Sequence, residues 1–166
     1  MVAQTVFGSI DGFSKGGVEI TGKDHPSRYL FSNMFEVAAQ SKPWERVVVA
    51  KNLEFTIEVV RSEGDSPWYT CAHDETALLM EGALEVHFIS PADNSILPSA
   101  DSEGAIRLEG SPAGAKMGFV QASRGHLTLL PARSAYQFRA GSRGVILMQS
   151  ALGEESIEKW ADICQR

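Results

Sequence analysis

Alternating apolar and polar positions recur along most of the chain, in short runs separated by turn residues. In the run from Leu53 to Val60, apolar residues occupy every second position, and Glu54 and Glu58 lie between them. A period of two is typical of a β-strand with one buried face. Comparable short runs predict further strands at Val47–Val49, Ala105–Leu108, Met117–Ala122, His126–Leu130, Tyr136–Ala140 and Val145–Gln149.

Turn-forming residues separate these runs. Ser, Gly, Asp and Pro crowd into residues 61–67, which we expect to form a turn. Two apolar runs, Thr76–Met80 and Ala83–Ile89, lie on either side of Gly82. Two strands around a tight glycine turn predict a β-hairpin.

The C-terminal residues follow a different period. Apolar side chains recur there at helical spacing, at Ile157, Trp160, Ala161 and Cys164, after the acidic pair Glu154–Glu155. This pattern predicts an amphipathic helix over about 153–165, packed on the barrel or on a partner. Many short strands and one terminal helix predict a single all-β domain, with an N-terminal extension over about 1–45 and a barrel over about 46–150.

Composition and charge narrow the class of protein. The chain has 166 residues, of which 43% are hydrophobic and 22% charged, which is ordinary for a single globular domain. Its net charge of −6 argues against a general affinity for nucleic acid or anionic membranes. Only Cys71 and Cys164 are present, and we expect free thiols, with a bridge between them as the alternative. With no secretion signal at the N-terminus and no apolar run long enough to span a bilayer, we expect a cytoplasmic protein.

Two segments resemble the two sequence motifs of the cupin family. The first motif corresponds to Ser66–Gly82 and the second to Gly125–Tyr136, with the variable stretch Pro91–Gly114 between them. In physical terms, Gly82 suits a tight turn and Pro131 ends the strand that precedes another turn. The resemblance implies an all-β cupin fold, the double-stranded β-helix or jelly-roll barrel.

Metal-binding cupins carry two His and one Glu in the first motif and a third His in the second. The resemblance places the Glu on Glu75, where it is retained. It places the two His on Tyr69 and Cys71, or on Trp68 and Thr70, and the third His on Tyr136. Three of the four ligands are therefore missing. Since a lone carboxylate does not hold Fe(II) or Zn(II), we expect no metal on this chain.

The four histidines leave one metal alternative open. His73 lies two residues before Glu75, so both could share one strand face and form a metal site with further ligands. A hydrogen-bonding role is the simpler interpretation of His73. We expect His25 and His87 to face solvent and His126 to lie at the barrel rim.

A closer resemblance covers nearly the whole chain. The segments Asp11–Ile20, Tyr29–Asn33, Pro67–Tyr69, Gly144–Leu152 and Glu158–Cys164 resemble the small subunit of two-component hydroquinone 1,2-dioxygenases. That family implies a heterotetramer with a larger cupin-like subunit, which carries Fe(II). The assembled enzyme opens hydroquinone with O₂ to 4-hydroxymuconic semialdehyde, in bacterial degradation of compounds such as 4-nitrophenol. The small subunit is then expected to hold no catalytic residue and no metal.

The residues at the degenerate motif are candidates for contact with that partner or with its aromatic substrate. They are Trp68, Tyr69, His73, Glu75 and Tyr136. Aromatic side chains beside a turn are favoured at interfaces, but the simpler interpretation is that Trp68 and Tyr69 fill the barrel mouth. Two other functions stay open at this point. One is a free-standing, metal-free cupin that binds a small ligand, and the other is an autonomous metallo-cupin that uses His73 and Glu75.

Overall fold

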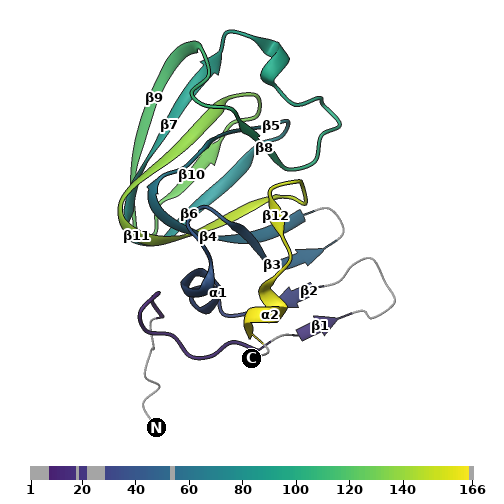
Figure 1. Cartoon of the computed structure of the whole chain (residues 1–166), viewed down its shortest axis with the longest axis vertical. Coiled ribbons are helices and arrows are strands. Elements are labelled where there is room, and N and C mark those ends of the chain that lie inside the picture. Colours follow the sequence, from purple (N-terminus) through teal and green to yellow (C-terminus); the bar gives the residue numbers. More distant parts are fainter. Residues whose placement is uncertain (1–7, 18, 22–28, 53–54, 165–166) are drawn as a thin grey trace.

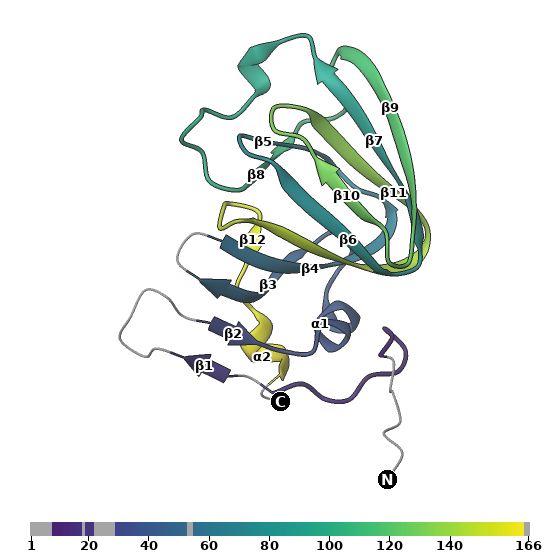
Figure 2. The same cartoon turned by 180° about the vertical axis from the view of Figure 1, so that it is seen from behind.

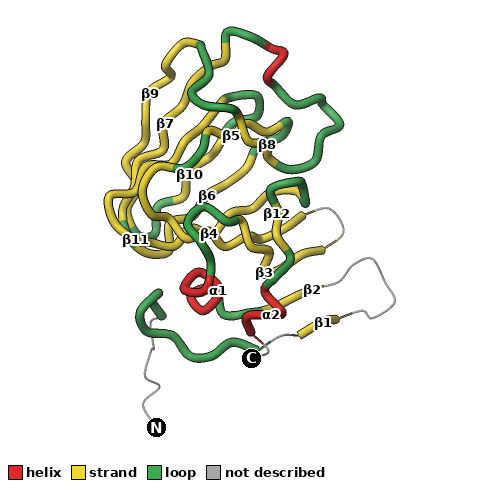
Figure 3. The backbone as a smooth tube through the Cα atoms, in the orientation of Figure 1, coloured by secondary structure: helices red, strands yellow, loops and turns green. Residues whose placement is uncertain are grey.

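The computed structural model describes residues 8–17, 19–21, 29–52 and 55–164. Strands dominate this part of the chain (Figures 1 and 3). They are β1 (Glu19–Thr21), β2 (Tyr29–Phe31), β3 (Arg46–Asn52), β4 (Phe55–Asp65), β5 (Trp68–Cys71), β6 (Glu75–Glu81), β7 (Ala83–Pro91), β8 (Ala105–Leu108), β9 (Gly114–Ser123), β10 (Leu127–Leu130), β11 (Ala135–Ala151) and β12 (Ser156–Ile157). Two α-helices, α1 (Met34–Gln40) and α2 (Trp160–Cys164), and the short 3-10 helix η1 (Asn94–Ile96) complete the described elements.

The main strands form a jelly roll of two connected layers. One layer has the order β10-β6-β11-β4-β3-β12, and the other is built from β9, β7, β11, β5 and β8. Figures 1 and 2 show the two layers curling around a common interior, while β1, β2 and both helices lie at one end. The expected all-β jelly-roll fold is therefore confirmed.

Strand β11 belongs to both layers. Its first part pairs with β5 and β7, and its second part pairs with β4 and β6. The register shifts between Ala140 and Gly144, where the strand bends from one layer to the other. Gly144 has no room for a side chain, since a Cβ atom there would lie 2.4 Å from the carbonyl oxygen of Glu81. The two strands predicted at 136–140 and 145–149 are thus one bent strand.

The predicted hairpin around Gly82 is wrong, although the turn itself is confirmed. Gly82 has a φ of +88° and joins β6 to β7. However, β6 pairs with β10 and β11, whereas β7 pairs with β9 and β11. The two strands therefore enter different layers. The physical reason is that the long bent β11 offers a hydrogen-bonding edge to each of them.

The expected turn at 61–67 is also corrected. Strand β4 continues to Asp65, with Ser62 opposite Gly144 and Asp65 opposite Arg139 on β11. Pairing with β11 overrides the local turn preference of Ser62 and Gly64. The chain leaves the strand only at Ser66 and Pro67.

Apolar side chains form two main clusters. One fills the interior of the barrel and includes Tyr69, Leu79, Val86, Tyr136 and Phe138. The other lies on the outer face of β3 and β4, beneath α1 and α2. The Asn33 side chain accepts hydrogen bonds from the backbone N–H groups of Phe35 (3.0 Å) and Glu36 (3.4 Å), and thereby caps the start of α1.

The C-terminal helix is shorter than the predicted span of 153–165. It begins at Trp160, because the preceding residues make a turn and then strand β12, which pairs in parallel with Arg46 and Val47 of β3. Cys164, the last residue of this helix, is buried as its spacing predicted, whereas the side chains of Trp160 and Ala161 lie outside the described part. Cys71 and Cys164 are both free thiols. Among the described helices, none has the length and apolar character that a membrane span requires.

Candidate functional site

The fold brings the degenerate metal-motif positions together inside the barrel. Tyr69 and Cys71 on β5 face the interior cluster, with Tyr136 of β11. Trp68 is next to Tyr69 on the same strand, so it points to the opposite face, where it packs on Ile89 and Ala135. The geometry therefore decides between the two alignments left open by sequence. Tyr69 and Cys71 stand where the resemblance places the first two histidines.

A buried arginine occupies the centre of this group. Arg46 of β3 donates from Nε to Oε2 of Glu58, over 2.6 Å, and from Nη2 to Oε1 of Glu75, also over 2.6 Å. Its Nη1 atom lies 3.4 Å from the hydroxyl of Tyr136, which in turn donates a short hydrogen bond to Oε2 of Glu75. The exposed fraction of the Arg46 side chain is 3%, and that of each carboxylate side chain is 0%.

Burial and charge act against each other in this network. Burial raises the pKa of the Glu75 carboxyl, but the Arg46 guanidinium outweighs it and holds that pKa below its usual range. Burial alone would lower the pKa of Arg46, but the Glu75 carboxylate helps to raise it well above its ordinary value. Burial and the Glu75 charge together raise the pKa of Tyr136. Arg46 and Glu75 are therefore ionised at neutral pH, while Tyr136 stays a neutral hydrogen-bond donor.

This arrangement does not fit a metal ion. Both oxygens of Glu75 are engaged, one by Arg46 and one by Tyr136. Within the described residues, no three His, Cys, Asp or Glu side chains lie close enough together to hold a metal. The positive charge that balances Glu75 comes from a guanidinium.

His73 contacts Cys71 and the end of β11. Its Nδ1 atom lies 3.4 Å from Sγ of Cys71, and its Nε2 atom accepts a hydrogen bond from the backbone N–H of Ala151 over 3.3 Å. Burial and the nearby Glu75 charge raise the pKa of the Cys71 thiol to about 11, so the thiol is protonated at neutral pH. His73 thus ties the β5–β6 turn to the end of β11. This favours the hydrogen-bonding interpretation over the His73–Glu75 metal site.

Sequence reasoning missed Arg46 and Glu58. Glu58 follows the alternation of β4, but the face of the strand that carries it points into the barrel and not toward solvent. Arg46 directly precedes the apolar Val47–Val49 run. An arginine at the start of an apolar strand is a signal for a buried ion pair, but the sequence does not show which carboxylates it meets.

A cavity of about 530 Å³ opens at the barrel mouth above this network. Its lining includes Trp44, Arg46, Tyr69, Arg107 and Glu155. Trp44 stacks on Phe138 with ring centroids 6.0 Å apart, and Tyr69 packs against Tyr136 at 5.8 Å. Burial and the Glu155 charge raise the pKa of Tyr69 to about 12.

The five candidate residues consequently lie in four different environments. Glu75 and Tyr136 are fully buried, so a substrate pocket that they line would have to lie in the barrel interior. Tyr69 reaches the barrel mouth, and His73 lies in the turn before β6. Trp68 borders a separate outer hollow of about 440 Å³ with His87 and Phe119. Whether any of them contacts a partner or a substrate stays a prediction.

The comparison with solved structures identifies close relatives. A chain of hydroquinone 1,2-dioxygenase PnpCD, in complex with Cd²⁺ and 4-hydroxybenzonitrile, is 46% identical. The alignment covers 99% of this chain and 98% of that chain, with a TM-score of 0.81. The chain belongs to the hydroquinone 1,2-dioxygenase family. A second member, hydroquinone 1,2-dioxygenase from Sphingomonas sp. TTNP3 with 4-hydroxybenzoate bound, is 43% identical over 99% of this chain and 98% of that chain, with a TM-score of 0.83.

More distant structures show the fold of this dioxygenase-family chain. A cupin-2 domain protein from Shewanella frigidimarina is 17% identical, with a TM-score of 0.50 over 70% of this chain and 89% of that chain. The fold is therefore that of the cupins. No family model and no curated protein sequence matches the chain.

Hydroquinone dioxygenase structures also contain a longer kind of chain with this fold. In PnpCD in complex with Fe³⁺, 72% of the present chain aligns with only 32% of another chain, at 11% identity and a TM-score of 0.54. The present chain covers nearly all of one kind of PnpCD chain and about a third of the other. It corresponds to the shorter kind.

Proposed function

We propose that this chain is the non-catalytic small subunit of an Fe(II)-dependent hydroquinone 1,2-dioxygenase. In this proposal it assembles with a larger cupin-like subunit, as a heterotetramer, and that subunit holds the iron. The complex cleaves the ring of hydroquinone with O₂ to form 4-hydroxymuconic semialdehyde. The observation that carries the proposal is the Arg46 guanidinium, which bridges Glu58 and Glu75 among the motif positions where a metal-binding cupin holds its metal.

The ion-pair network explains why this chain would act through its partner. A metal cannot enter without displacing a guanidinium that is bonded to two buried carboxylates and lies beside the Tyr136 hydroxyl. Displacing it would leave buried charges without partners, which is strongly unfavourable. The chain can still stabilise the larger subunit and exclude water from that subunit's site.

Reconstitution tests the proposal directly. The present chain and the larger cupin chain from the same organism are purified separately and mixed, and iron content and hydroquinone-dependent O₂ uptake are measured for each sample. We expect iron in proportion to the larger chain, no ring cleavage by the present chain with Fe(II) alone, and full activity only in the mixture. Ring cleavage by the present chain with Fe(II) alone would contradict the proposal, and so would full activity of the larger chain alone.

The contact residues need a finer test in the assembled enzyme. We propose that Trp68, in its outer hollow, helps to wall the partner's aromatic-substrate site. Trp68→Phe is then expected to raise KM for hydroquinone with a smaller effect on kcat, because a wall residue acts mainly through substrate binding. Trp44→Phe at the barrel mouth is the control and should leave KM unchanged. Equal KM values for wild type, Trp68→Phe and Trp44→Phe would show that Trp68 does not line the substrate site.

A second function is favoured by the cavity at the barrel mouth. Its aromatic lining by Trp44 and Tyr69 and its volume of about 530 Å³ suit a small aromatic ligand. A free-standing ligand-binding cupin would bind such a compound without any larger subunit. Calorimetric titration of the isolated chain with hydroquinone distinguishes the two functions, since the subunit proposal expects no binding to this chain alone.

A further inference from the structure

Exposed apolar side chains gather on two successive strands. Seven large hydrophobic side chains are exposed in the described residues, and five of them lie on β9 and β10. They are Met117 (56%), Phe119 (54%), Val120 (42%), Leu127 (66%) and Leu129 (54%), which we call the β9–β10 edge. The two leucines lie opposite β6 in one layer, Phe119 lies opposite β7 in the other layer, and a short turn joins the two strands. Such a concentration on two successive strands is typical of an interaction site.

Both strands also have an unpaired side. Among the residues that the structure describes, β9 pairs only with β7, and β10 pairs only with β6. Figures 1 and 2 show β9 along the outside of the molecule. Exposed edge strands are usually protected from association by charged residues. Lys116 is the single charged residue within β9, and β10 has none.

The leucines of β10 continue an apolar face that is covered elsewhere. The register aligns Val47, Val59, Leu147, Leu78 and Leu127 in one row across five strands. Val47 and Val59 are fully buried because α1 packs on β3 and β4 and α2 packs on β3. At the other end of the row Leu127 is 66% exposed. The helices thus cover one half of a continuous apolar face and leave the β10 half open.

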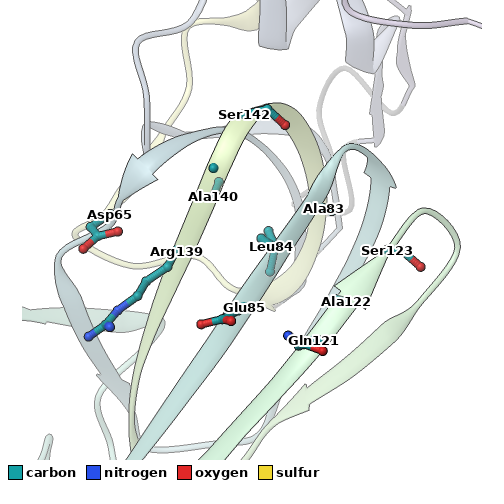
Figure 4. Close-up of a pocket in the computed structure, with 11 residues that line it drawn as sticks. Asp65, Ala83, Leu84, Glu85, Gln121, Ala122, Ser123, Arg139, Ala140 and Ser142 are labelled. Atoms are coloured by element: carbon teal, nitrogen blue, oxygen red, sulfur yellow. The ribbon is translucent and has the colours of Figure 1, made fainter.

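Hollows flank the β9–β10 edge on the outer side of β9. Phe119 borders the 440 Å³ hollow that also contacts Trp68 and Lys116. A larger groove of about 700 Å³ lies next along the strand (Figure 4), where Gln121 of β9, Glu85 of β7 and Arg139 of β11 come from neighbouring strands. Recesses beside exposed apolar side chains can accept protruding residues of a partner.

The charges around the β9–β10 edge favour a partner other than a second copy. Residues 110–153 contain five Lys or Arg and no Asp or Glu, although the whole chain has a net charge of −6. Near the edge these are Lys116, Arg124 and Arg133, all exposed. They outnumber the acidic residues beside the edge, which are Glu85, opposite Gln121 of β9, and Asp74, which accepts a hydrogen bond from the backbone N–H of Ala132. A two-fold homodimer would bring this mainly basic surface against itself, and like charges would oppose each other. A different chain with acidic residues around an apolar centre would complement it.

We propose that the β9–β10 edge is the surface on which this chain binds the larger, cupin-fold subunit, through an apolar patch with an acidic rim on that subunit. The inference rests on the proposed function and adds the docking surface to it. The unpaired sides of β9 and β10 offer backbone N–H and C=O groups to that partner, and the leucines and Phe119 supply the buried apolar area.

The test compares variants that differ only in where an exposed apolar residue is replaced. The double variant Leu127→Lys/Leu129→Lys and the single variant Phe119→Lys alter the β9–β10 edge. Phe55→Lys is the matched control, because Phe55 is 52% exposed and lies on β4, away from the edge. Binding to the larger chain is measured by sedimentation velocity, and folding of each isolated variant by circular dichroism and its Tm.

We expect each edge variant to keep the wild-type spectrum and to bind at least about tenfold more weakly, as loss of an interface anchor implies, while Phe55→Lys binds normally. Raising the salt concentration should weaken wild-type binding, because the basic rim contributes to it. If wild type binds and the edge variants bind equally well, the docking surface is wrong and the subunit function stands. If wild type does not bind the larger chain, the proposed function itself fails. A wild-type homodimer that the edge variants dissociate would assign the edge to a second copy and overturn the inference.

Discussion

Arg46 is the residue on which the interior of this protein depends. Its guanidinium is almost fully buried and meets Glu58 and Glu75 at 2.6 Å each. A buried ion pair is weak support for stability in itself, because both partners lose hydration. Removing one partner is different, since the remaining charges stay buried without compensation. Removing any one of Arg46, Glu58 and Glu75 is therefore expected to destabilise the fold strongly.

The first prediction concerns Arg46 itself. Arg46→Met should lower the free energy of unfolding by about 3–5 kcal/mol, because it leaves two buried carboxylates unpaired. Arg61→Met is the control, since Arg61 pairs with Glu63 at the surface, and it should cost less than about 1 kcal/mol. Urea denaturation of both variants measures the difference. Equal losses would show that the buried network contributes no more than a surface pair.

The second prediction concerns pH. Arg46 holds the pKa of Glu75 below its usual value of 4.5, so its ionised form stabilises the fold above that value. This contribution is lost as the pH falls through the lowered pKa, when Glu75 becomes protonated. Urea titrations of wild type and Glu75→Gln should therefore differ most near neutral pH, and the difference should shrink as the pH falls below 4.5 through the lowered pKa. A difference that does not shrink at any acidic pH where the protein still folds would contradict the role given to this carboxylate.

At the scale of elements, the bend in β11 organises the fold. The strand pairs with β5 and β7 before the bend and with β4 and β6 after it. The same bend separates β6 from β7, which sequence alone suggested were hairpin partners. Gly144 permits the close approach, because any side chain there would meet the backbone of Glu81.

The third prediction tests this bend. Gly144→Ala places a Cβ atom 2.4 Å from the carbonyl oxygen of Glu81 and should destabilise the fold by about 1–3 kcal/mol. Gly141→Ala is the matched control in the same bend, since a Cβ atom there meets nothing within 4 Å. Its effect should stay within about 0.5 kcal/mol. Thermal denaturation of the two variants distinguishes crowding at Gly144 from a general need for glycine in the bend.

At the scale of the whole molecule, the apolar outer surface of the sheets is buried unevenly. The helices bury the outer face of β3 and β4, while the β9–β10 edge exposes five large apolar side chains. The charge is uneven too, because the basic segment 110–153 belongs to an acidic chain. Both features suit a protein that completes its surface by assembling with a different chain.

The fourth prediction follows from that assembly. A partner that binds only the folded state stabilises it by mass action, by about 2.7 kcal/mol at a concentration one hundred times Kd. For a domain of this size we expect the Tm to rise by roughly 5–10 °C in excess larger subunit. Differential scanning fluorimetry of the isolated chain and of the mixture measures the shift. An unchanged Tm at saturating partner would show that the larger subunit does not bind the folded chain.

The sequence by itself determined the fold class, most strand positions and the loss of the metal ligands. These features are local, because alternation, turn residues and motif spacing are properties of neighbouring positions. It also placed Glu75 and Tyr136, and Tyr69 as one of two alternatives, at ligand positions of the metal motif, and the structure brings these three residues together. Helix α1 escaped prediction although Asn33 and Glu36 have the spacing of a helix start.

Only the tertiary structure decided what replaces the metal, which strands pair, and which apolar side chains stay exposed. Arg46 lies 29 residues before Glu75 and 90 before Tyr136, so no local pattern connects them. Val59 and Leu127 have the same apolar character in sequence, but helix α1 covers β4 and leaves β10 open. Burial depends on which elements pack together. The charge network and the docking surface therefore arise from contacts between distant segments.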